Sequence, residues 1–117
     1  MAKANVVLDK SFDFALEIID LYKMLIENKE YILSKQLLRS GTSIGANVEE
    51  GIGAYSKKDF TSKMGLALKE ARETRYWLKL LNRSQIVKYS YIVYLEKIEE
   101  LVNILTSIVK TLQTENL

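Results

Sequence analysis

The sequence predicts an all-α protein, folded as an up-down-up-down antiparallel four-helix bundle in a single domain over residues 1–117. The chain has no Pro, so nothing in its composition interrupts long helices. Apolar residues recur at spacings of three and four, the period of a helix face, at approximately 9–27, 34–55, 57–82 and 90–113. The short segments between these four stretches make consecutive helices antiparallel neighbours.

The first helix is expected at about residues 9–27, with one buried apolar stripe. That stripe comprises Phe12, Ala15, Ile19, Tyr22 and Ile26, with Phe14, Ile18 and Leu25 beside it. The polar run at residues 28–30 is expected to end this helix. Ser34 is the expected N-cap of the second helix, because a serine hydroxyl accepts a hydrogen bond from a free backbone N–H of the first turn.

The second helix contains an unusual run, RSGTSIGANVEEG, at residues 39–51. Its content of small and polar residues is typical of loops. Helical spacing nevertheless continues through Leu37, Gly41, Ile44, Val48, Ile52 and Tyr55. A phosphate-binding loop is the alternative, but no Lys follows the glycines and no strand precedes them. Gly41 and Gly45, four residues apart, are therefore expected to let a neighbouring helix pack closely.

The third and fourth helices show the most regular apolar spacing. Ser56, with Asp59 three residues later, has the form of a capping box that begins the third helix. Its stripe comprises Phe60, Met64, Ala67, Ala71, Thr74, Leu78 and Leu81. A loop follows, and Ser90 is the expected cap of the fourth helix. The fourth stripe comprises Tyr91, Tyr94, Ile98, Leu101, Leu105, Ile108 and Leu112.

The composition excludes several kinds of chemistry. The chain has no Cys and no His, so disulfides, thiol chemistry, the commonest zinc ligands and the commonest general base are absent. Glutamates on the second and third helices suggest a carboxylate site, but di-iron bundles also need Glu-x-x-His pairs. These glutamates are Glu49, Glu50, Glu70 and Glu73. Glu73 is instead expected to pair with Arg39, and we expect no catalytic residue, no metal, no cofactor and no enzymatic activity.

Composition also bears on location. Hydrophobic residues make up 48% and charged residues 27% of the chain, as in ordinary soluble globular proteins. The first ten residues contain no apolar signal segment. No apolar run approaches the roughly 20 residues that cross a bilayer. We therefore expect a cytoplasmic protein without a membrane partner.

Positive charge is concentrated in the third helix. Residues 56–83 carry eight Lys or Arg against three Asp or Glu, while the whole chain has a net charge of +2. At about 100° per residue, seven cations share an arc of about 120° that also contains Tyr76. The seven are Lys57, Lys58, Lys69, Arg72, Arg75, Lys79 and Arg83. Such a stripe is a candidate surface for RNA or DNA phosphates. The alternative is a solvated helix face whose positive charges are compensated by acidic neighbours, such as the first helix.

Two apolar groups have further interpretations. Leu66, Trp77 and Leu80 spread beyond the seam that one bundle needs. They are candidates for an oligomer interface, and the alternative is the shoulder of a wide core face. Three tyrosines gather at the start of the fourth helix, namely Tyr89, Tyr91 and Tyr94. We expect them to close the end of the bundle rather than to stack on bases.

Two segments carry a family resemblance, RSGTSIGANVEEG at residues 39–51 and ALKEARETRYWLKL at residues 67–80. With Phe60 and residues 98–101, they resemble the four-helix bundle protein family, also called the 23S ribosomal RNA intervening-sequence protein family. The resemblance implies small bacterial proteins that form ring-like homo-oligomers, typically pentamers, some encoded within 23S ribosomal RNA genes. A related branch is the accessory variability protein of diversity-generating retroelements, which binds a reverse transcriptase and nucleic acid. The family has no established catalytic residues, so none is carried over.

The sequence thus predicts a non-enzymatic, oligomeric helical bundle that binds RNA or DNA through the basic stripe of its third helix. The alternative is a protein–protein interaction scaffold without nucleic-acid binding, whose stripe meets an acidic surface on another protein.

Overall fold

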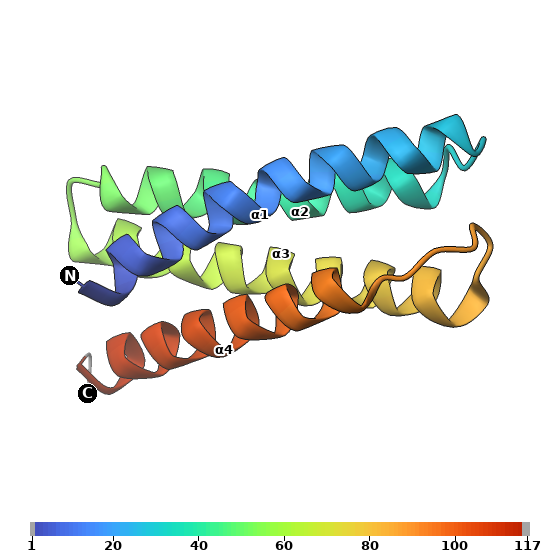
Figure 1. The fold of residues 1–117 in the computed structure, drawn as a ribbon. Coiled ribbons are helices and arrows are strands. Elements are labelled where there is room, and N and C mark those ends of the chain that lie inside the picture. Colours follow the sequence, from blue (N-terminus) through green and yellow to red (C-terminus); the bar gives the residue numbers. More distant parts are fainter. Residues whose placement is uncertain (1, 116–117) are drawn as a thin grey trace.

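The computed structural model describes residues 2–115 as four long helices. They are α1 (Ala2–Glu27), α2 (Leu33–Ile52), α3 (Lys57–Ser84) and α4 (Ile92–Glu115). Each helix packs against two others, so that α1 and α3 both lie between α2 and α4, while the backbones of the diagonal pairs do not come close to one another within residues 2–115. Figure 1 shows this antiparallel arrangement, with the N-terminus of α1 and the C-terminus of α4 at the same end. The predicted all-α four-helix bundle is confirmed.

The register of α1 differs from the expected one. The helix begins at Ala2, and its buried stripe is Ala4, Val7, Ser11, Phe14, Ile18, Leu21 and Leu25. Phe12, expected in the core, is 63% exposed. The reason is that α1 has apolar residues on two adjacent faces, and the stripe that faces the core is interrupted by polar Ser11. Ser11 is nevertheless fully buried, with its hydroxyl donating to Leu8 O at 3.1 Å.

The start of α2 is capped by an acidic side chain rather than by Ser34. The carboxylate of Glu30 accepts hydrogen bonds from the backbone N–H of Ile32 at 3.2 Å and of Ser34 at 2.6 Å. A carboxylate there also interacts favourably with the helix dipole. The other end comes earlier than expected, because Gly53 caps the helix after Ile52. Tyr55, expected to continue the helical spacing, therefore lies beyond the helix and is exposed, as is Ile52 at its last position.

The small residues of α2 let α1 come close. A Cβ on Gly41 would lie 2.9 Å from Ile18 Cγ2, which is well inside ordinary contact distance, and one on Gly45 would lie 3.4 Å from Ser11 O. Polar side chains in the run bond back to the preceding turn, as Thr42 Oγ1 does to Leu38 O at 2.7 Å. This stretch is thus regular helix with its polar groups satisfied locally.

The third helix forms as its sequence indicates, whereas the fourth begins at Ile92, two residues after Ser90, so the prediction that Ser90 caps it is wrong. The hydroxyl of Ser56 accepts from the backbone N–H of Asp59 at 3.1 Å and so caps α3. Tyr91, just before α4, is fully buried and donates its hydroxyl hydrogen to Val87 O at 2.8 Å. Burial first, then the neighbouring Glu30 and Tyr89, raises the pKa of this phenol above its usual 10.0. No helix within residues 2–115 is long and apolar enough to cross a membrane.

Replacing Gly41 with Leu should destabilise the protein. The new side chain must displace Ile18, and overpacking of this kind costs about 1–3 kcal/mol. The same change at Gly65 is a matched control, because a Cβ there meets nothing within 4 Å. Gly65→Leu should raise the free energy of unfolding by about 0.5–1 kcal/mol, because Leu has a higher helix propensity than Gly. Urea denaturation measures both free energies of unfolding, and equal values for the two variants would contradict the close packing.

Candidate nucleic-acid interface

One face of α3 carries a regular row of exposed, mostly basic side chains. The row is Lys69, Arg72, Tyr76, Lys79 and Arg83, and all five are exposed. Their spacings of three, four, three and four residues keep them on one face of the helix. At about 1.5 Å of rise per residue, the row is about 21 Å long. We call these five residues the basic row. Lys58 is exposed on the same face, nearer the start of α3.

Three of the seven predicted cations, namely Lys57, Lys58 and Arg75, lie outside this row, and Lys57 and Arg75 form ion pairs with α4. Lys57 Nζ lies 2.9 Å from Glu115 Oε2, and Arg75 Nη1 lies 3.1 Å from Glu99 Oε1. For Lys57 and Arg75, the structure therefore agrees with the alternative interpretation, in which the cations pair with acidic residues of a neighbouring helix. The other five make no ion pair within residues 2–115: Lys58, Lys69, Arg72, Lys79 and Arg83.

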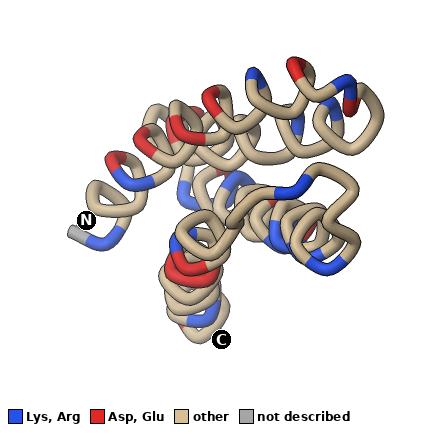
Figure 2. Tube along the Cα trace, turned by 45° about the vertical axis from the view of Figure 1, so that its right-hand side comes forward, with Lys and Arg blue, Asp and Glu red and all other residues tan. Residues whose placement is uncertain are grey.

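The acidic residues of α1 do not neutralise the row. Because α1 and α3 are diagonal in the bundle, their backbones do not come into contact. Figure 2 shows several Asp and Glu along α1, and Lys and Arg along α3. Within residues 2–115 the first helix, named as an example of an acidic neighbour, forms no ion pair with α3, whereas α4 supplies the partners of Lys57 and Arg75. Sequence reasoning missed Lys88, an exposed cation in the connection that follows Arg83, because it lies outside the helical arc.

A chain of polar and aromatic contacts supports the row from α2. Arg39 of α2 pairs with Glu73 through Nη2 and with Glu70 at 3.3 Å through Nη1. The same Glu73 carboxylate accepts the indole N–H of Trp77 at 3.0 Å. The Trp77 ring in turn packs edge to face with Tyr76, with ring centroids 5.2 Å apart and an interplanar angle of 67°. The expected pair of Arg39 and Glu73 is present, and it links α2 to the centre of the basic row.

The apolar trio borders the same face. Leu66 is 41% exposed, whereas Trp77 and Leu80 are half-buried. Trp77 also packs against the hydrophobic core, so part of this residue belongs to the shoulder of the core face. The trio as an oligomer interface remains a prediction.

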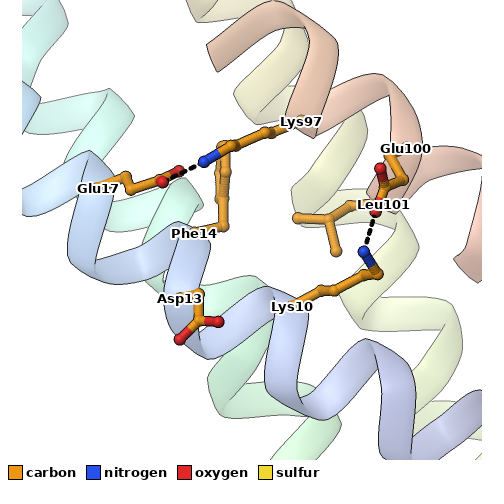
Figure 3. A pocket seen from close by; sticks show the side chains of 7 residues that line it. All are labelled: Lys10, Asp13, Phe14, Glu17, Lys97, Glu100 and Leu101. Atoms are coloured by element: carbon orange, nitrogen blue, oxygen red, sulfur yellow. Dashed lines mark hydrogen bonds and ion pairs between the residues drawn. The ribbon is translucent and has the colours of Figure 1, made fainter. Parts of the chain in front are cut away.

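A groove lies between α1 and α4. Phe14 and Leu101 line it, together with the two ion pairs Glu17–Lys97 and Lys10–Glu100 (Figure 3). Its volume is about 180 Å³. Both glutamates already form ion pairs with lysines of the facing helix. We therefore interpret these residues as a link between α1 and α4 rather than as a binding site. Residues 2–115 contain no cluster of three or more acidic side chains that could hold a metal ion.

The comparisons with known proteins agree with this architecture. The family described as 23S rRNA-intervening sequence protein matches residues 3–107. The chain belongs to this family. A crystal structure of a protein with unknown function from the S23 ribosomal protein family of Bacteroides thetaiotaomicron is 51% identical and superposes with a TM-score of 0.86. The match covers 92% of this chain and 98% of that one. A search of curated proteins finds no match.

Breaking the link between α2 and α3 should alter the environment of Trp77. Replacing Glu73 with Leu removes the acceptor of the indole N–H, so we expect a shifted emission of Trp77, the only Trp in the chain. Arg39→Met and Glu73→Leu together should also show a coupling of up to about 1 kcal/mol in the free energy of unfolding.

The matched control is Glu50→Leu, because Glu50 pairs with Lys63 and not with Arg39. This variant should leave the Trp77 emission unchanged and should be additive with Arg39→Met. Additive effects of Arg39→Met and Glu73→Leu would show that the contact contributes nothing to stability.

Proposed function

We propose that this protein is a non-enzymatic nucleic-acid-binding protein, which contacts the phosphate backbone of RNA or DNA through the basic row of α3. The observation that carries the proposal is a set of five exposed cations on one helix face, the four of the basic row and Lys58, which form no ion pair in residues 2–115. Glu70 and Glu73, the α3 carboxylates nearest to the row, are both engaged by Arg39. A polyanion is the ligand whose charge pattern such a surface fits.

The energetics favour a ligand with closely spaced negative charges. Lys79 and Arg83 are four residues apart, and like charges at this spacing destabilise a helix by a few tenths of a kcal/mol. Binding of phosphates would relieve this repulsion. It would also release counterions that are condensed on the nucleic acid, which is the main source of affinity for backbone contacts.

The alternative function is a protein–protein interaction scaffold. An acidic surface of another protein would meet the same cations, and its binding would also weaken with salt. The two functions differ in their ligand, because a nucleic-acid site binds free RNA or DNA of unrelated sequences. We favour the nucleic acid because the cations follow one another along a helix face in a line, as the phosphates of a nucleic-acid backbone do.

We further propose that the chain assembles with copies of itself, in a ring as the family resemblance implies. Exposed apolar side chains on two helices support this proposal: Phe12 and Leu16 on α1 are 63% and 51% exposed, and Leu66 on α3 is 41% exposed. Exposed apolar patches of this kind mark contacts between proteins. Repetition of the basic row around a ring would multiply the number of phosphates contacted at once.

Charge reversal in the basic row should abolish nucleic-acid binding. The variant combines Lys69→Glu, Arg72→Glu and Lys79→Glu, and its control combines Lys23→Glu, Lys35→Glu and Lys110→Glu. The control residues are also exposed and outside the ion pairs of residues 2–115, so both variants undergo the same change in net charge.

Fluorescence anisotropy with RNA and with DNA at several salt concentrations measures the effect. The row variant should lose binding, and single neutral substitutions in the row should each reduce the slope of log K against log salt by about 1. The control should keep a slope close to that of the wild type. The proposal would be contradicted if both triple variants lost the same amount of binding affinity, or if the wild type bound neither RNA nor DNA at low salt.

Light scattering at micromolar concentration tests self-assembly. The wild type should have the mass of an oligomer, and Leu66→Glu should shift it toward the monomer because a charge replaces an apolar contact. Ile86→Glu is the control, since Ile86 is 61% exposed in the connection between α3 and α4. A monomeric wild type would show that the exposed apolar residues do not join copies of the chain.

A further inference from the structure

The centre of the basic row is an aromatic residue. Tyr76 is 56% exposed, with Arg72 four residues before it and Lys79 three residues after it. On a helix, residues at these spacings have Cβ atoms about 5–6 Å apart. Lys69 and Arg83 lie seven residues to either side, at about 10 Å along the helix axis. An exposed phenol ring is thus flanked by cations on both sides.

The Tyr76 ring contacts its neighbour Trp77, which is itself linked to α2. It packs edge to face with Trp77, whose indole N–H is bound by Glu73, which pairs with Arg39 of the neighbouring helix. An isolated tyrosine on a helix surface exchanges between rotamers, and ordering it on a ligand costs free energy. Here the contact with Trp77 orders the ring in advance and leaves more than half of the side chain open to solvent.

We propose that Tyr76 is a stacking platform for an unpaired base, so that the basic row prefers single-stranded nucleic acid over a duplex. This inference rests on the proposed function and specifies its ligand class. In a duplex the faces of the bases are covered by their neighbours, and only phosphates would reach the row. In a single strand a base can lie on the tyrosine while the phosphates on either side of it meet Arg72 and Lys79.

Tyr91, Tyr89 and Tyr55 do not have this combination of features. Tyr91, the last residue of the connection between α3 and α4, is fully buried. Tyr89 is exposed, but its ring packs on Tyr91, outside the basic row. Tyr55 is fully exposed in the connection between α2 and α3, and no aromatic ring packs against it within residues 2–115. Tyr55 is therefore a matched control for the loss of an exposed phenol.

The test compares Tyr76→Leu, Tyr76→Phe and Tyr55→Leu in the full chain. Each is titrated with a short oligouridylate, an oligothymidylate of the same length, and a duplex with the same number of phosphates. Tyr76→Leu should weaken binding to both single strands by about 5- to 150-fold, the range that corresponds to one lost base stack. Its duplex binding should stay within about twofold of the wild type. Tyr76→Phe and Tyr55→Leu should bind all three ligands as the wild type does.

Trp77 gives a second readout, because it is the only Trp in the chain and contacts Tyr76. Its emission should change when a single strand binds to the wild type or to Tyr76→Phe, and should change less with the duplex. Tyr76→Leu that weakens single-strand and duplex binding equally, or neither, would overturn the stacking role while leaving the phosphate-binding function in place. Absence of wild-type binding to all three ligands at low salt would instead remove the proposed function itself.

Discussion

The close approach of α2 to α1 is the constraint on which the rest of the bundle depends. Gly41 lies against Ile18, and Gly45 lies against Ser11, where the buried hydroxyl replaces an apolar side chain. With this face of α2 committed to α1, an adjacent face turns to α3. There Ser40 shares a buried hydrogen bond of 2.9 Å with Thr74. The glycines therefore set both the spacing of two helices and the rotation of α2 that brings its polar side chains to α3.

The order of the helices around the bundle decides which charges remain free. Acidic α1 and basic α3 occupy opposite corners, so their charges do not compensate one another across an interface. Instead α4 takes two cations of α3, through Glu115 and Glu99. The same four helices with α1 beside α3 would have brought these opposite charges together. The free positive face is thus a consequence of topology as well as of sequence.

The sequence predicts the bundle and the basic row well, because both depend on local helical periodicity. The stripe of α3 is buried as expected apart from a half-buried Phe60. The register of α1 could not be predicted, because Ser11 is polar and its burial depends on the space beside Gly45. The partners of Arg75 and the cap formed by Glu30 also needed tertiary structure. Periodicity identifies a face of a helix, whereas the neighbours of that face depend on how the helices pack.

Arg39 connects the packing of the bundle to the electrostatics of its surface. It engages Glu70 and Glu73, the two carboxylates at the border of the basic row. Without that arginine, two negative charges would lie beside the cations and weaken their attraction for phosphates, since charges a few ångströms apart act on the same ligand. Through Glu73 the same residue also orders Trp77. One side chain on α2 thus keeps the potential of the α3 face positive and supports the ring at its centre.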